Sequence, residues 1–352
     1  MAENNFDKGY LQRYLSFRLG EEVAVHDVVK FPRGVSRETW FVEYSTKDRA
    51  PRKLVFRRNL PGGSICPATL TFEYGVYERL QDSDIPVPGV YWYEDSAEWT
   101  GDSRPFYVRD HVEGDWNLPH FLDRDPQYDG MRIAISQEHI SHLAKIHTCD
   151  WQALGFDEIM EVPKSPADCA ETIIVSTEKK LAEFQMQPFP VLAEAREWLL
   201  DNAPRNASRI SLLKGTNGLG EEVFRDGKIV AMSDWELAAL GDPAYDWAQI
   251  QDLVPEINVD GENIWGLQKA LNYYEDLCGI HVDATSVQYY RVLYGLIMTM
   301  FSHNAGVPLV NGTDLMARLA WVSTEMVFRG QSGLAAVTGI VKVPEPVPGQ
   351  LG

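Results

Sequence analysis

The residues best suited to chemistry directly follow a short apolar run in the second half of the chain. Ile229 to Met232 leads into Ser233-Asp234-Trp235-Glu236. A carboxylate at the end of a buried strand is held by the strand and left accessible by the turn, a position that often carries function. Carboxylate oxygen is also the ligand that Mg²⁺ takes beside phosphate groups. Asp234 is therefore a candidate metal ligand, and the alternative is that it only caps the turn.

The loop before this run combines glycines with charged residues. The glycines are Gly215, Gly218 and Gly220, and the charged residues are Lys214, Glu221 and Glu222. Glycines can adopt positive φ and expose backbone N–H groups, which predicts a nest for an anion with the lysine beside it. The two glutamates would supply an acid or a base. The alternative is an ordinary flexible turn, since most glycine-rich loops are only turns.

The elements that position these loops belong to two kinds of sequence. Up to residue 112, β-branched and aromatic runs between turn residues are typical of strands. We predict strands at Val23–Phe31, Thr39–Tyr44, Lys53–Arg58, Val90–Tyr93 and Pro105–Val112, and one helix at Ala68–Leu80. We therefore expect an N-terminal β-rich lobe over residues 1–112.

Beyond Gly114 the apolar period becomes helical. We predict helices at Ser136–Thr148 with Ser136 as N-cap, Pro166–Phe184, Val191–Ala203, Asp242–Val254, Asn263–Cys278, Thr285–Phe301 and Gly312–Arg329. Asp226-Gly227 between two apolar runs predicts a β-hairpin from Glu222 to Ser233. We expect a helical lobe over residues 113–334 and an irregular tail over 335–352. The fold class is thus α+β, with a small antiparallel β lobe and a large mainly helical lobe.

Composition and charge exclude several classes of function. The 352 residues include 32 Lys and Arg against 51 Asp and Glu, a net charge of −19. Such a chain should repel nucleic acid and anionic membranes. Met1 to Gly20 shows no signal-peptide core, and no apolar run reaches the roughly 18 residues of a membrane span. Four widely spaced cysteines predict free thiols in a reducing, cytoplasmic setting rather than disulfides or a zinc site.

Several segments, taken in order, resemble one known family. They are KLVFRRNLPGG, FEYGVYERL, IPVPGVYWYEDS, RPFYVRDHVEGDW, HISHLAKIHTCDWQALGF and SDWELAALGDPAYDWA. Together they are similar to the aminoglycoside phosphotransferase and choline-kinase-like superfamily, and to the branch that includes the kinase-like domain of some acyl-CoA dehydrogenase proteins. The matches run from about Gly34 to Ile250. The resemblance implies a protein-kinase-like fold of two lobes, with ATP and Mg²⁺ between them.

The resemblance also assigns roles to residues of the N-terminal lobe. Gly34 and Ser36 match the turn that covers the phosphates. Arg57 matches the strand lysine that contacts them, and Glu73 matches the helix acid that pairs with it. Arginine can still bridge a carboxylate and a phosphate, but as a fork rather than a point charge. ATP would sit near the linker from Arg109 to Gly114, which makes Asp110 a further candidate for nucleotide binding.

The catalytic loop departs from the family pattern, which reads approximately HGDlhpgN. Aligned without gaps from Asp234, only Gly215 survives. Lys214 stands at the histidine position, Thr216 at the aspartate position and Glu221 at the asparagine position. The aspartate of kinases accepts the acceptor's hydroxyl proton and the asparagine helps hold metal. Thr216 is not appreciably ionised near neutral pH, whereas Glu221 keeps an oxygen ligand for the metal.

Three functions follow from this loop. We predict an ATP- and Mg²⁺-dependent kinase that phosphorylates a hydroxyl of a small organic acceptor, with weakened or altered catalysis. Apolar and acyl-bearing molecules are among the candidate acceptors. The second possibility is a nucleotide-binding pseudokinase. The third is a non-kinase enzyme that reuses the cleft, with Lys214, Thr216, Glu221 or Glu222 as catalytic residues. A fold alone does not choose between them.

Overall fold

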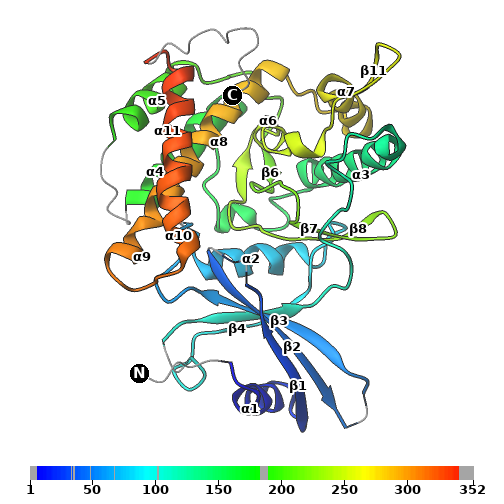
Figure 1. Cartoon of the computed structure of the whole chain (residues 1–352), viewed down its shortest axis with the longest axis vertical. Helices are drawn as coiled ribbons and strands as arrows, with labels where there is room; N and C mark the ends of the chain where they lie inside the picture. The colour runs from blue at the N-terminus through cyan, green and yellow to red at the C-terminus, as the bar shows by residue number, and fades with distance from the viewer. Residues whose placement is uncertain are drawn as a thin grey trace.

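A five-stranded antiparallel sheet with strand order β1-β2-β3-β5-β4 forms the smaller of two lobes (Figure 1). The computed structural model describes residues 6–32, 34, 36–47, 49–66, 68–100, 103–182 and 189–340. The strands are β1 (Val23–Lys30), β2 (Arg37–Thr46), β3 (Arg52–Asn59), β4 (Val90–Glu94) and β5 (Phe106–Asp110). Every strand predicted for this region is present, which confirms the strand-rich reading of its β-branched and aromatic runs.

Two helices cover the two faces of this sheet. Helix α2 (Leu70–Leu80) lies between the sheet and the larger lobe, as Figure 1 shows, and it is the predicted helix. Helix α1 (Lys8–Leu19) packs on the opposite face and was not predicted. It begins at Asp7, whose side chain accepts a hydrogen bond from the Tyr10 N–H at 2.7 Å, and it ends at Gly20 in the left-handed region.

The alternation of side chains along β2 and β3 decides what each face does. Even-numbered apolar residues pack against α1 in a separate aromatic-rich core, and they include Trp40, Val42, Leu54 and Phe56. Odd-numbered residues point the other way, toward the larger lobe, and they include Thr39, Phe41, Val55 and Arg57. The alternation of side chains that builds the core of the small lobe therefore also places Arg57 of β3 at the space between the lobes.

The larger lobe is mainly helical. Its helices are α3 (Asp129–Thr148), α4 (Cys169–Ala182), α5 (Pro190–Asp201), α6 (Ala244–Trp247), α7 (Leu267–Cys278), α8 (Ala284–Asn304), α9 (Gly306–Val310), α10 (Ala317–Trp321) and α11 (Val327–Val337). Three short strand pairs join them: β6 (Ser211–Leu213) with β9 (Ala239–Gly241), β7 (Glu222–Arg225) with β8 (Lys228–Met232), and β10 (Ile257–Val259) with β11 (Glu262–Trp265). The β7–β8 pair is the predicted hairpin, and its turn residues Asp226 and Gly227 both have positive φ.

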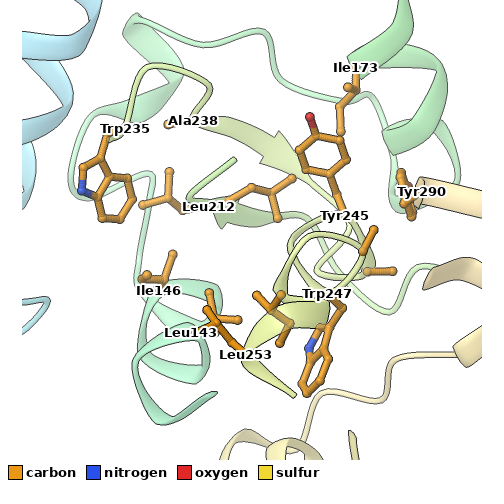
Figure 2. Close-up of a cluster of buried hydrophobic side chains, with 14 of the residues drawn as sticks. Leu143, Ile146, Ile173, Leu212, Trp235, Ala238, Tyr245, Trp247, Leu253 and Tyr290 are labelled. Carbon is orange, nitrogen blue, oxygen red and sulfur yellow. The ribbon is translucent and has the colours of Figure 1, made fainter. Parts of the chain in front are cut away.

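One hydrophobic core supports the loops of interest. Leu212 of β6, Trp235 and Ala238 after β8, and Tyr245 and Trp247 of α6 are all buried in it (Figure 2). Leu143 and Ile146 of α3 close it from a second side, and Tyr290 of α8 from a third. Because interiors are packed at nearly crystalline density, such a core fixes the loops that start and end in it.

Several sequence-based boundaries were wrong. Ser136 is not an N-cap, because α3 already begins at Asp129 and the Ser136 hydroxyl accepts a hydrogen bond from the Trp265 indole at 3.0 Å. The helix predicted over Asp242–Val254 is only α6 followed by a 3₁₀ turn at Ile250–Leu253. The helix predicted over Gly312–Arg329 starts at Ala317 and contains a π-helical turn at Val322–Met326.

The predicted irregular tail was also wrong at its start. Helix α11 continues through Ala335 to Val337, and residues 341–352 lie outside the described part of the chain. No helix among the described residues is long and apolar enough to cross a membrane. All four cysteines are free thiols, as predicted.

Candidate functional site

A cleft of about 700 Å³ separates the sheet of the small lobe from the loops of the larger lobe. It is lined by residues singled out from the sequence, among them Gly34, Ser36, Arg57, Asp110, Gly220, Glu221, Glu222 and Asp234, but not by Thr216. Glu73 and Lys214 are fully buried and contact lining residues from behind. The fold therefore gathers residues from positions 34 to 234 around one space.

The roof of the cleft is built around the buried carboxylate of Glu73. Arg57 approaches one carboxylate oxygen at 3.3 Å and Arg37 donates to the other at 3.2 Å. The Tyr107 hydroxyl donates a third contact at 2.9 Å. Burial alone would raise the pKa of Glu73, but Arg57 and Arg37 hold it below its usual value. Glu73 is 0% exposed and Arg57 only 11%, which excludes ordinary surface charge for both.

Strand register explains why these groups meet. Arg57 of β3 lies opposite Tyr107 of β5, so both side chains reach the same residue of α2. Arg109, two positions further along β5, lines the cleft together with Arg57. Its guanidinium lies over the Tyr77 ring at 5.4 Å and donates to the Ser233 hydroxyl at 3.4 Å. Arg109 therefore joins the sheet to the loop after β8.

The turn expected to cover phosphates has a steric reason for its glycine. A Cβ at Gly34 would lie 2.1 Å from the carbonyl oxygen of Arg37, a distance at which the backbone must move. Gly34 and Ser36 both line the cleft. Their neighbours Arg33 and Val35 lie outside the described residues. Asp110, at the end of β5, lines the cleft too and accepts a hydrogen bond from the Tyr91 hydroxyl at 2.5 Å.

The floor of the cleft is the end of the β7–β8 hairpin. Glu222 starts β7 and Asp234 lies two residues after β8, so the pairing of the strands brings them to the same end. The Ser233 N–H donates to the Glu221 carbonyl oxygen at 2.9 Å and ties the two loops together. Asp234 has a φ of 65°, unusual outside glycine, and its N–H donates to the Tyr77 hydroxyl at 3.2 Å.

Of the acids that line the cleft, Asp234 and Glu236 have no close partner in the part of the chain that the structure describes. Among the described residues, no hydrogen bond or ion pair involves the Asp234 carboxylate, and one buried oxygen of Glu236 has no hydrogen-bond partner. Burial and the neighbouring Asp234 raise the pKa of Glu236 to about 8. Burial also raises the pKa of Asp234, against the opposing effect of Arg57 and Lys214. A buried, unpaired acid facing a cleft indicates a binding site.

The loop from Lys214 to Glu222 is anchored by one buried carboxylate. Asp246 of α6 accepts the N–H groups of Lys214 at 2.8 Å and Gly215 at 2.9 Å. Its Oδ2 also lies 3.0 Å from Nε2 of His147, whose Nδ1 is 2.7 Å from the Tyr274 hydroxyl. His147 is thus a core histidine with both nitrogens satisfied. Gly215 has a φ of 80°, and a Cβ there would lie 2.0 Å from the Leu237 carbonyl oxygen.

The predicted anion nest was wrong. The Gly215 N–H is bound by Asp246, and the Gly218 N–H donates to Oε2 of Glu221 at 2.9 Å. Gly218 does not adopt a positive φ, whereas Gly220 does, at 96°. The carboxylates of Asp246 and Glu221 therefore already accept the hydrogen bonds of two N–H groups that a bound anion would need. The sequence could not show this, because Asp246 lies about 30 residues away.

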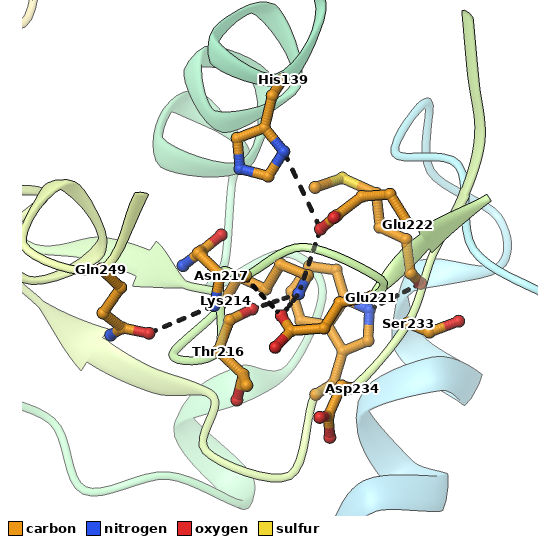
Figure 3. A network of polar contacts seen from close by, with 12 residues as sticks. His139, Lys214, Thr216, Asn217, Glu221, Glu222, Ser233, Asp234 and Gln249 are labelled. Atoms are coloured by element: carbon orange, nitrogen blue, oxygen red, sulfur yellow. Dashed lines mark hydrogen bonds and ion pairs between the residues drawn. The ribbon is translucent and has the colours of Figure 1, made fainter. Parts of the chain in front are cut away.

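Lys214 lies at the centre of a buried polar network (Figure 3). Its ammonium donates to the Thr216 carbonyl oxygen, and it lies 3.2 Å from Glu221 Oε2 and 3.5 Å from Glu222 Oε1. Burial opposes its charge, but the two glutamates raise the pKa of Lys214 above its usual value. The Thr216 hydroxyl is buried and has no hydrogen-bond partner among the described residues.

The residues around Asp234 fit a metal ion only in part. No group of three or more His, Cys, Asp or Glu side chains in the described part of the chain is arranged to hold one. Mg²⁺, however, needs only one or two carboxylates when substrate phosphates and water complete its shell. The unpaired Asp234 carboxylate meets that requirement, whereas Glu221 already binds Lys214 and Gly218.

Comparisons with known proteins decide the family. The sequence model of the phosphotransferase enzyme family matches residues 27–263, more than half of the chain. The chain belongs to the phosphotransferase enzyme family. It is also 26% identical over 262 residues to acyl-CoA dehydrogenase family member 11 of Rattus norvegicus. That match covers 71% of this chain but only 31% of the rat protein, so the chain spans about a third of this relative's length.

Solved structures of phosphotransferases share the fold. A Ralstonia eutropha protein assigned to the aminoglycoside phosphotransferases superposes with a TM-score of 0.67 at 20% identity, covering 95% of this chain and 99% of that one. A thermostable mutant of aminoglycoside phosphotransferase APH(4)-Ia, in complex with ADP and hygromycin B, gives 0.56 at 16% identity with the same coverage. The resemblance found in the sequence and the protein-kinase-like fold it implied are both confirmed.

Three residues of the phosphotransferase cleft were missed by sequence reasoning. Arg37 was not named, and Arg109 was named only as the start of the linker. Both share a strand face with predicted residues, so the period of two could have found them. Glu236 stands inside a matched segment but was given no role. What sequence could not show is that all three surround the same space, because their contacts join distant segments.

Proposed function

We propose that this chain binds ATP between its lobes and transfers the γ-phosphoryl group to a hydroxyl of a small organic acceptor. The observation that carries the proposal is the pairing of a basic roof with an acidic floor across one cleft. Arg57 and Arg109 face the space from the sheet, and Asp234 faces it from the hairpin. The negative charge of a triphosphate would be neutralised by the arginines of the sheet on one side and by a metal ion bound to Asp234 on the other.

Each part of ATP has a suitable neighbour in the cleft. Phe31, Phe41 and Val55 give an apolar wall beside the linker for the adenine ring. Arg57 would bind phosphate oxygen while Glu73 holds its guanidinium in place. Asp234 would hold Mg²⁺, which when bound neutralises phosphate charge. A solved structure with the same fold contains ADP in a ternary complex, which supports a nucleotide as the ligand.

Transfer would proceed without an aspartate base at position 216. Phosphoryl transfer relies mostly on positioning and charge neutralisation, so it can survive the loss of a base that is worth about 10²- to 10⁴-fold. We therefore expect a slow kinase rather than an inert one.

An apolar hollow beside the cleft supports an apolar or acyl-bearing acceptor. It has a volume of about 430 Å³, and Trp116, Leu118, Pro119, Leu122 and Leu219 line it together with four polar residues or glycine. It shares Trp116, Leu219 and Gly220 with the cleft, so an acceptor held there would reach the catalytic loop. Apolar walls with a few polar groups are typical of small-molecule sites.

The test is transfer of label from [γ-³²P]ATP in the presence of Mg²⁺. We would offer hygromycin B as a polar alcohol and medium-chain 3-hydroxy acids as apolar ones. The proposal predicts label on the hydroxy acids, and less label when Trp116→Ala opens the hollow. Label on hygromycin B alone would contradict the acceptor class, and label on neither would contradict kinase activity on these classes.

One observation favours a second candidate, a nucleotide-binding protein without transfer. Position 216 carries no ionisable group, and Lys214 holds the carboxylate at the asparagine position. This candidate would be supported over the kinase if the wild-type chain binds ATP but transfers phosphate to no acceptor, and if the Thr216→Asp variant also transfers none.

A further inference from the structure

The catalytic loop contains a cation of its own. The Lys214 side chain is 0% exposed, and its ammonium lies among the Thr216 carbonyl oxygen, Glu221 Oε2 at 3.2 Å and Glu222 Oε1 at 3.5 Å (Figure 3). A buried ammonium with two carboxylates and a carbonyl around it is strongly held in its charged form. The chain thus carries a permanent positive charge, the Lys214 ammonium, buried behind the residues that line the cleft.

This cation uses the carboxylate that a second metal ion would need. Glu221 Oε2 accepts from both Lys214 and the Gly218 N–H at 2.9 Å, so two donors of the chain already occupy this oxygen. Mg²⁺ requires anionic or carbonyl oxygen in near-octahedral order, and a neighbouring ammonium repels it. The Asp234 carboxylate has no such partner among the described residues and faces the cleft. The two acids at the floor are therefore not equivalent.

We propose that Lys214 takes the place of one of the two divalent ions that protein kinases hold at this position. Glu221 then serves as the partner of Lys214, and a single metal ion is left, at Asp234. This inference rests on the proposed function, because the remaining ion is bound together with ATP. It also gives a physical reason for the change of residue types, since a lysine and a glutamate replace a histidine and an asparagine of the family loop.

Two consequences distinguish a tethered ammonium from a second ion. An ammonium on the chain does not dissociate, so free Mg²⁺ beyond the amount that forms the MgATP complex should not tighten nucleotide binding. Its removal should also leave the Glu221 carboxylate without its lysine, while the charge of the Asp234 carboxylate still acts on it electrostatically. Carboxylates so placed are suitable ligands for a divalent cation.

The experiment counts metal ions directly. Mn²⁺ replaces Mg²⁺, AMP-PNP replaces ATP, and the free Mn²⁺ signal in electron paramagnetic resonance gives the number of ions bound per chain at saturating nucleotide. The wild-type chain should bind one. Lys214→Met should bind two. Because that variant leaves Glu221 and Glu222 without their lysine, we add Lys214→Met/Glu222→Gln, which also removes the buried carboxyl group of Glu222 and should likewise bind two.

The control is Lys228→Met, the same substitution at a lysine that is 72% exposed and pairs with Glu138 at 2.7 Å. It should bind one ion, like the wild type. Two ions in the wild type with AMP-PNP bound would overturn this inference and leave the proposed function standing. One ion in a folded Lys214→Met/Glu222→Gln chain would also overturn it. Failure of the wild type to bind AMP-PNP would contradict the proposed function itself, and this inference with it.

Discussion

Glu73→Gln tests the construction of the cleft roof. The carboxylate contacts two buried guanidinium groups and one tyrosine, and the substitution removes its charge while nearly keeping its shape. Arg37, which is 1% exposed, would then lose its only carboxylate partner among the described residues. Breaking a buried ion pair from one side costs about 3 to 5 kcal/mol, because an uncompensated charge stays buried.

The assay is urea unfolding followed by far-ultraviolet circular dichroism. Glu78→Gln is the matched control, since it is the same substitution on the exposed face of the same helix. Exposed substitutions of this kind usually change the free energy of unfolding by less than about 0.5 kcal/mol. We expect Glu73→Gln to lose about 3 to 5 kcal/mol and Glu78→Gln to stay near the wild type.

A pH series adds a sign to this prediction. The pKa of Glu73 is lowered below 4.5 in the folded chain, so its stabilising effect is present at neutral pH and is lost as the pH falls through the folded pKa. The difference between Glu73→Gln and the wild type should therefore shrink in acid. Equal stabilities of Glu73→Gln and Glu78→Gln at pH 7 would refute the reasoning, because the buried charges would then have another source of compensation.

Further substitutions test the floor and its loops. Asp234→Asn should weaken Mg²⁺-dependent ATP binding at least about tenfold by calorimetry, a loss of about 1.4 kcal/mol; unchanged affinity would remove Asp234 from the metal site. Thr216→Asp should raise the rate of phosphoryl transfer by up to about 10²-fold in a radiolabel assay; no gain in a folded variant would mean that the acceptor is held elsewhere. Gly215→Ala should lower stability by more than about 2 kcal/mol, because a left-handed backbone and a Cβ 2.0 Å from the Leu237 carbonyl oxygen act together; wild-type unfolding would contradict this. The wild type should lose stability as the pH rises from 4.5 through 8, because the pKa of Glu236 is raised to about 8 in the folded chain. Glu236→Gln should therefore have the same melting temperature as the wild type at pH 5 and a higher one at pH 9. Equal melting temperatures at pH 9 would contradict the raised pKa.

The sequence predicts the small lobe well because its signals are local. Strands β1 to β5 follow β-branched and aromatic runs, and the Asp226-Gly227 turn forms the hairpin that it indicates. Helix α1 had local signals too, in the Asp7 cap and in Gly20, but its apolar residues are diluted by charged and polar ones. It becomes clear as an element only when its buried side chains are seen against the sheet.

The failures are residues whose partners lie far away in the sequence. Ser136 has the chemistry of an N-cap, yet its hydroxyl binds the indole of Trp265 within the core. The glycines of the catalytic loop have the chemistry of an anion nest, yet Asp246 takes the Gly215 N–H group. Propensity describes what a residue can do locally, and tertiary contacts decide which of these roles it plays.

The contacts of the candidate site were predicted only in part from the sequence. Family resemblance predicted that Arg57 and Glu73 would pair, and the structure contains that ion pair. It did not predict that Lys214 would be fully buried between two glutamates, because the loop pattern that the sequence resembles has histidine at that position. Departures from a family pattern therefore need the structure most, since the pattern says nothing about what replaces the lost contacts.

The central claim is that the cleft binds ATP, and calorimetric titration of the purified chain with ATP in the presence of Mg²⁺ tests it most directly. The account predicts saturable binding of one nucleotide per chain. At about 100 times the dissociation constant, that binding should also raise the free energy of unfolding by about 2.7 kcal/mol. Absence of binding heat, together with an unchanged melting temperature at millimolar ATP, would contradict the account.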